Sequence, residues 1–292
     1  MANKPELVQA PKNVTKFDKP TLVRRSEAVR FLWGDETAHF VPDLIYGRGE
    51  RMAALIFKLA PGEYFRSSET WRTMYDQDRY YFVVSGELTI QDPETGDVAV
   101  AKANEVIYWR GARYHFGYNF NFEETFVLDW YAPQERPSHI PEIATSVSKR
   151  RLGKRIDGRE ELLTNWPSAS TSDHAMRHKE GRVTALRRSD ALSIIHGEKT
   201  PVRIDIFASS SNLTAGVFDL RPSIMSDPEV HGGDETLFAL DGSVSVYLPD
   251  TYDWFELHPK DNLFIPEGTP HQYCNMSDQA AEFFFTVAPR YR

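Results

Sequence analysis

Residues 229–242 read EVHGGDETLFALDG, and residues 266–275 read PEGTPHQYCN. Alternate residues of a strand share one face, so the side chains of Glu229, His231 and Glu235 can project together. The Pro and Gly of the second stretch predict a tight turn that delivers His271 onto the next strand. Two imidazoles and one or two carboxylates suit Fe, Mn, Ni, Co or Zn. If both strands line one barrel, we expect one divalent transition metal on His231, Glu235 and His271, with Glu229 as the candidate fourth ligand.

These stretches belong to a pattern that occurs twice. Residues 22–29 (LVRRSEAV) resemble residues 185–192 (ALRRSDAL), and later landmarks recur in the same order. Both halves contain short runs rich in Val, Phe, Tyr, Leu and Ile, bounded by Gly, Pro, Asp or Asn, which is typical of strands in a sandwich or barrel. The predicted fold is all-β, with two barrels in tandem. The predicted divisions are a first barrel at 22–135, a connecting arm at 136–184 and a second barrel at 185–292.

The two stretches together resemble the motifs of the cupin superfamily. The first motif ends in His, three or four residues, Glu, six residues and Gly, as in His231, Glu235 and Gly242. The second motif, Pro-x-Gly-x-x-His-x-x-x-Asn, matches the stretch that contains His271. The resemblance implies two jelly-roll-like cupin barrels with a metal inside. Where the family usually has His-x-His, this chain has Glu229 in the first position.

The first half lacks most of these ligands. Aligning the turn glycines of the two halves places Arg79 at the position of Glu235, with Tyr75 and Thr73 at the two earlier ligand positions. Only His115 remains. An arginine cannot ligate a cation, and its charge repels one. The first barrel is therefore predicted to be metal-free. Its polar residues either bind an anionic ligand or form a hydrogen-bonded core, and we favour the core.

Composition narrows the class of protein. The formal charge of −8 argues against general nucleic-acid binding. No apolar run is long enough to span a bilayer, and the polar N-terminus does not read as a secretory signal. Cys274 is the single cysteine, so no intrachain disulfide can form, which fits a cytoplasmic protein. The family resemblance also implies a homodimer.

A metal held by three or four protein ligands keeps positions open for substrate or dioxygen. We therefore expect an enzyme that acts on a small organic molecule, with oxidoreductase (dioxygenase) chemistry as the leading hypothesis. Isomerase, lyase or hydrolase chemistry is the alternative. Asp234 and Glu267 are candidate acid/base or supporting groups. Tyr273 shares the strand face of His271, so it is a candidate for orienting the substrate.

Two further hypotheses remain open. Glu-x-His followed by another ligand four residues later resembles ureidoglycine aminohydrolase, a manganese enzyme, although this chain has Glu235 and His271 where that family has His and Gln. A non-catalytic ligand-binding or storage cupin is the second hypothesis. Storage cupins usually lack the metal ligands, which argues against that role.

Overall fold

The computed structural model describes residues 11–75, 77–110, 113–132, 182–289 and 291. Strand is almost the only regular secondary structure of the described residues, as the sequence predicts, and their one helical element is the 3-10 turn η1 (Arg188–Asp190). Most of the predicted connecting arm, including all of 136–181, lies outside the described residues. Among the described residues, no helical segment has the length and apolar character that a bilayer crossing requires.

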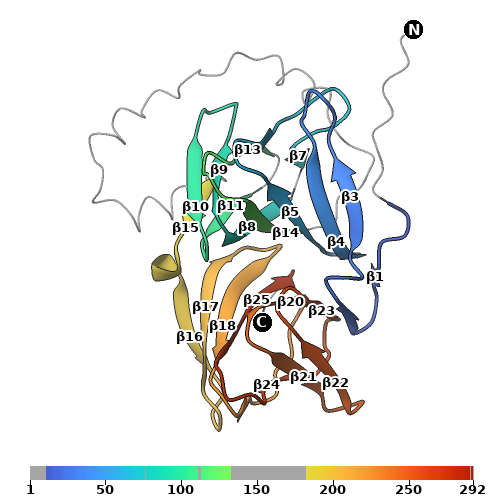
Figure 1. Cartoon of the computed structure of the whole chain (residues 1–292). Coiled ribbons are helices and arrows are strands. Elements are labelled where there is room, and N and C mark those ends of the chain that lie inside the picture. Colours follow the sequence, from blue (N-terminus) through green and yellow to red (C-terminus); the bar gives the residue numbers. More distant parts are fainter. Residues whose placement is uncertain (1–10, 76, 111–112, 133–181, 290, 292) are drawn as a thin grey trace.

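Each half of the chain contains one large and one small sheet (Figure 1). In the first half the large sheet has the order β1-β4-β5-β14-β8-β11-β15, with β3 paired to β4, and the small sheet has the order β10-β9-β13-β6. A separate pair joins β7 and β12. The bounds are β1 (Lys16–Phe17), β3 (Val29–Trp33), β4 (Val41–Gly49), β5 (Ala53–Leu59), β6 (Tyr64–Phe65), β7 (Met74–Tyr75), β8 (Asp78–Ser85), β9 (Glu87–Gln91), β10 (Val98–Lys102), β11 (Val106–Trp109), β12 (Arg113–Tyr114), β13 (Phe116–Tyr118), β14 (Thr125–Ala132) and β15 (Thr184–Leu186).

The second half repeats this arrangement. Its large sheet has the order β16-β17-β18-β25-β20-β23-β2, and its small sheet has the order β19-β24-β21-β22. The bounds are β2 (Thr21–Val23), β16 (Leu192–His196), β17 (Val202–Ser209), β18 (Thr214–Leu220), β19 (Ile224–Met225), β20 (Asp234–Asp241), β21 (Val244–Leu248), β22 (Asp253–Leu257), β23 (Asn262–Ile265), β24 (Gln272–Asn275) and β25 (Ala281–Ala288). Strands β8, β11 and β14 therefore correspond to β20, β23 and β25.

The two halves exchange a strand. β2 comes from the start of the first half, yet it pairs with β23 of the second half. β15 comes just before the second half, yet it pairs with β11 of the first half. Each large sheet is thus completed by a short strand from the other half, so the backbone hydrogen-bonding edges of β11 and β23 are paired rather than exposed.

Three apolar clusters hold this arrangement together. One fills the inside of the first barrel and one fills the inside of the second. The third lies between the halves, where the outer faces of the two large sheets meet. There Phe284 stacks on Trp130 with ring centroids 4.8 Å apart and contacts Phe82 at 4.6 Å. Alternation along the strands sends one set of side chains into a barrel and the other set into this shared core.

The repeated turn residues have structural roles. Gly86 and Gly242 have φ of +81° and +69°, and a Cβ at either would lie within 2.7 Å of a neighbouring oxygen atom. Asn275 donates from its side chain to the carbonyl oxygens of Leu220 and Gln279. Asn119 makes the equivalent bonds in the first half. These motif residues shape the turns that position the neighbouring histidines.

Candidate metal centre

Two short backbone contacts bring the predicted ligands together inside the second barrel. Glu229 and His271 form an isolated antiparallel bridge, with hydrogen bonds of 2.8 and 3.0 Å. His271 immediately precedes β24, and Glu235 is the second residue of β20. His231 lies in the connection between Glu229 and β20. All four side chains are buried, with exposures of 1–6%.

Both histidines are oriented by a backbone carbonyl. Nδ1 of His271 lies 2.9 Å from the carbonyl oxygen of Thr269, and Nδ1 of His231 lies 3.1 Å from that of Tyr291. An Nδ1–H group that donates to a carbonyl leaves Nε2 as the ligating atom, an arrangement common in metal-binding histidines. The two Nε2 atoms consequently face the same region, towards Glu235.

Glu235 lies between the two imidazoles. Its Oε1 is 3.5 Å from Nε2 of His231, and its Oε2 is 3.1 Å from Nε2 of His271. Burial raises the pKa of Glu235, but the two histidines outweigh it and hold the pKa at about 2. Burial lowers the pKa of His231, but Glu235 and Glu229 outweigh it and raise the pKa to about 9. The two carboxylates therefore favour positive charge within the site, either on an imidazole or on a bound cation.

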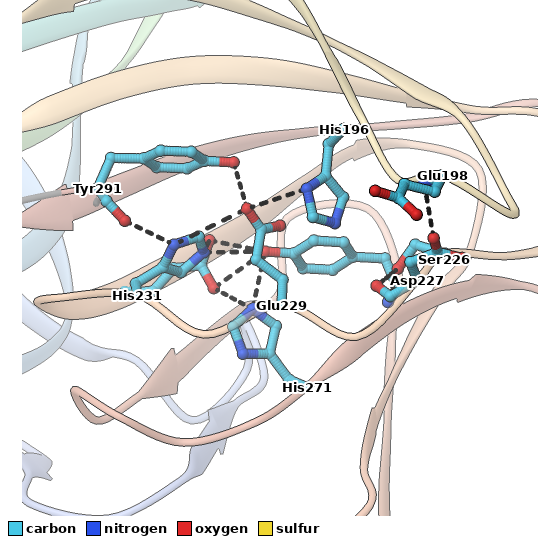
Figure 2. Close-up of polar contacts among 10 residues, drawn as sticks. His196, Glu198, Ser226, Asp227, Glu229, His231, His271 and Tyr291 are labelled. Carbon is cyan, nitrogen blue, oxygen red and sulfur yellow. Dashed lines mark hydrogen bonds and ion pairs between the residues drawn. The ribbon is translucent and has the colours of Figure 1, made fainter.

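Glu229 lies on the Nδ1 side of His231, with its Oε1 3.9 Å from that nitrogen (Figure 2). Its Oε1 accepts a hydrogen bond of 2.6 Å from the hydroxyl of Tyr291. Its Oε2 is buried and has no hydrogen-bond partner. Ligand atoms of Glu229, His231 and His271 all lie within 4.8 Å of one another. A buried carboxylate oxygen without a partner is costly, and a bound cation would satisfy it.

The residues fit a divalent transition metal. Donor atoms around such a cation lie about 2.1 Å from it, so neighbouring donors are about 3 Å apart and opposite donors about 4.2 Å. The separations of 3.5 and 3.1 Å between the Glu235 oxygens and the two Nε2 atoms fall close to this range. Glu229 fits less tightly, since its group with the two histidines extends to 4.8 Å. Two imidazoles and two carboxylates would hold the ion, and both histidines already have the carbonyl partners that such ligands require.

The three predicted catalytic residues fall in two places. The hydroxyl of Tyr273 lies 2.9 Å from Nε2 of His271 and 3.0 Å from Oε1 of Glu235, within the site. Asp234 and Glu267 instead contact Arg51 of the first half, and the main-chain N–H of Glu267 donates to Asp234. Among the described contacts, none joins either carboxylate to a histidine of the site. Their proposed acid/base roles stay predictions.

Two residues of the site were not anticipated from the sequence. His196 ends β16, and its Nδ1 lies 3.7 Å from Oε1 of Glu229 (Figure 2). Tyr291 packs its ring on His231 at 4.5 Å besides bonding to Glu229. The repeat offered one signal: His196 precedes Gly197 where Trp33 precedes Gly34, a change from an apolar to a titratable residue.

The first barrel holds different chemistry at the equivalent position. Arg79 pairs across the sheet with Trp109 of β11 and Tyr131 of β14. Glu235 pairs with residues of β23 and β25, the corresponding strands of the second barrel. The Nε of Arg79 donates to Oδ1 of Asp129 at 2.9 Å, and its guanidinium lies 4.6 Å from the ring centre of Tyr131. Both members of the ion pair are buried. This pairing satisfies the arginine internally, which supports a structural core over an anion site.

His115, the remaining motif histidine, is also occupied within the first barrel. Its Nε2 lies 2.9 Å from the hydroxyl of Tyr81, and its ring packs on Trp109 at 4.5 Å. Burial and then the positive charge of Arg79 lower the pKa of His115 well below its ordinary value. Thr73 pairs with the hydroxyl of Ser67. The side chain of Tyr75 lies outside the described residues.

Comparisons with known proteins agree with this architecture. Residues 216–287 match the family model of the cupin domain. This match lies within the second barrel, and the arrangement of the two halves fits a two-barrel protein of the cupin superfamily. The sequence has no match among the curated proteins.

Solved two-barrel structures resemble the fold over nearly the whole chain. One is an oxalate decarboxylase of Lactobacillus farciminis in a formate complex, with a TM-score of 0.60, 16% identity and coverage of 98% of this chain and 89% of that one. A second is protein Ylba of E. coli, with a TM-score of 0.61, 12% identity and coverage of 96% and 94%. A third is the oxalate decarboxylase of Bacillus subtilis studied for its Mn(II) centres, with a TM-score of 0.60, 15% identity and coverage of 97% and 80%. At these identities the likeness shows the fold.

Proposed function

We propose that this protein is a metal-dependent enzyme that acts on a small organic molecule in its second barrel. The observation that carries the proposal is the convergence of His231, Glu235, His271 and Glu229, all buried, with one carboxylate oxygen left without a partner. A core built only for stability would pair these groups fully or replace them with apolar residues.

The metal, when bound, would supply Lewis acidity and an open position for substrate or dioxygen. The protein's part is to hold the donors in place and keep the site dry. Carbonyl oxygens fix both imidazoles, and Tyr291 fixes Glu229. The hydroxyl of Tyr273 contacts the donors directly. The apolar cluster of the second barrel surrounds the site and lowers the local dielectric, which strengthens each of these contacts.

Two reaction types remain as candidates. The two-histidine, two-carboxylate set is rich in hard oxygen donors and suits Mn(II) or Fe(II). Iron would favour dioxygenase chemistry. Manganese would favour redox-neutral lyase, isomerase or aminohydrolase chemistry on a small acid, in line with the manganese centres named for the decarboxylase of the same fold. The identity of the metal therefore decides between them.

The test starts from purified protein loaded separately with Fe(II) and Mn(II). Metal content, oxygen uptake and carbon dioxide release are followed with a panel of small organic acids, oxalate included. We expect one metal per chain and turnover with one of the two ions. Turnover that consumes oxygen supports the dioxygenase, whereas turnover under anaerobic conditions supports the redox-neutral class.

Matched variants locate the activity. Glu235→Gln keeps the size of the side chain but removes its charge, so we expect it to lose most of the metal and the turnover. Glu256→Gln makes the same change in an exposed residue of β22, outside the site, and we expect it to keep both. A Glu235→Gln variant with full metal and activity would overturn the proposed site. A Glu267→Gln variant that keeps metal and loses turnover would assign Glu267 a catalytic role.

A further inference from the structure

The hydroxyl of Tyr273 lies among the atoms that face the proposed cation. It is 2.9 Å from Nε2 of His271, 3.5 Å from Nε2 of His231, and 3.0 and 3.2 Å from the two oxygens of Glu235. One oxygen atom therefore contacts donor atoms of three separate ligands. The side chain of Tyr273 is fully buried, so its hydroxyl does not reach solvent.

The side from which the hydroxyl approaches distinguishes a ligand from a supporting residue. A supporting residue contacts a ligand on the side away from the metal, as the carbonyl oxygen of Thr269 does at Nδ1 of His271. Tyr291 likewise donates to Oε1 of Glu229 and leaves Oε2, which has no hydrogen-bond partner, available to the cation. Tyr273 instead contacts both histidines at Nε2, the atoms that are free to bind the cation.

The distances agree with coordination. Neighbouring donors of a single cation lie about 3 Å apart when each is about 2.1 Å from it. The four separations of the Tyr273 oxygen span 2.9–3.5 Å. We propose that the phenolic oxygen of Tyr273, which releases its proton to solvent when the metal binds, is itself a ligand of the metal bound by His231, Glu235 and His271. This inference rests on the proposed metal site and adds an oxygen donor to it.

The residue is held in this position by the fold. Tyr273 lies in β24, two residues after His271, so strand alternation directs both side chains to the same face. Its ring packs on Phe218 at 4.8 Å and on Phe283 at 5.1 Å. Its main-chain N–H donates to the hydroxyl of Ser226. The phenol therefore has little freedom to leave the donor set.

Ferric iron provides a test that does not depend on activity. A tyrosine oxygen bound to Fe(III) gives a ligand-to-metal charge-transfer band in the visible, which carboxylates and imidazoles do not give. The full chain is loaded with iron, oxidised, and measured for iron content and visible absorbance. We expect about one iron and the band in the wild type, and loss of the band in Tyr273→Phe. Tyr247→Phe is the matched control, because this half-buried tyrosine of β21 belongs to the same barrel but packs on Trp254 at 4.7 Å, outside the donor set; it should keep the iron and the band.

The outcomes separate this inference from the proposed function. A wild type that binds iron without the band overturns the tyrosine ligand and leaves the metal site standing, and so does a band that persists in Tyr273→Phe. A wild type that binds no metal overturns both. If Tyr273→Phe loses the iron together with the band while folded by circular dichroism, and Tyr247→Phe keeps both, coordination by Tyr273 is supported.

Discussion

The two barrels share a backbone, yet they balance charge in opposite ways. At equivalent positions of the strand ladder the first barrel has Arg79 and the second has Glu235. Asp129 of a neighbouring strand neutralises the arginine, so Arg79 does not need an anionic ligand. The second barrel gathers two carboxylates and two imidazoles, and among the described contacts no lysine or arginine pairs with either carboxylate. The arginine at the position of Glu235, together with Thr73 and Tyr75 at the two earlier ligand positions, separates this paired core from the proposed metal site.

The difference between the two barrels predicts its largest effect on the metal content of variants. His271→Ala should lose the bound metal, because the remaining donors lack one nitrogen ligand. His115→Ala should leave the metal content unchanged, because His115 bonds to Tyr81 beside an arginine. Metal analysis of both purified variants checks this. Equal loss of metal in the two variants would contradict a single metal-binding barrel.

The buried ion pair of the first barrel gives the next largest effect. Arg79→Met should lower the free energy of unfolding by about 3–5 kcal/mol, because Asp129 would remain buried without its partner. Chemical denaturation measures this change. The double variant Arg79→Met with Asp129→Leu should recover much of the loss. A double variant no more stable than the single one would argue against the pair as the cause.

Metal binding should stabilise the folded chain. An ion at a free concentration of about 100 times its dissociation constant adds about 2.7 kcal/mol. Removal of the ion with a chelator should therefore lower the melting temperature of the wild type. The melting temperature of His271→Ala should not respond to the chelator, whereas that of His115→Ala should respond as the wild type does. A response in His271→Ala would place the stabilising ion elsewhere.

The smallest effect concerns pH. Burial raises the pKa of Asp129 to about 6, although Arg79 opposes the shift. The folded chain therefore holds a proton that the unfolded chain releases near pH 4. As a result, the Asp129 contribution to the free energy of unfolding falls as pH rises from about 4 to about 6.

Asp129→Asn removes this titration. Relative to the wild type, the variant should gain stability by up to about 2 kcal/mol between those two pH values. Denaturation curves of both proteins across the range measure the difference. A constant difference would show that Asp129 has an ordinary pKa in the folded state.

Much of the fold and part of the site followed from the sequence. The repeat, the short apolar runs and the turn glycines predicted an all-β chain, because strand periodicity and positive φ are local requirements. The motif also predicted that Glu229, His231 and Glu235 would gather near His271, and their side chains do so. The expected strand alternation is not the reason, because Glu229 and His231 precede β20 and only Glu235 lies in it. The alignment gave Arg79 and Glu235 equivalent positions in the two barrels, and the observed strand registers agree with it.

Other features required contacts between distant segments. The exchange of β2 and β15 between the halves, the partner of Arg79, and the approach of His196 and Tyr291 to Glu229 all join residues far apart in the chain. The same holds for Asp234 and Glu267, whose carboxylates meet Arg51 across the two halves.

The sequence by itself determined which residues could ligate, because this depends on the chemistry of the side chains. Only the tertiary structure decided which charges are neutralised and which remain available, because that depends on the side chains that neighbouring strands bring within about 4 Å.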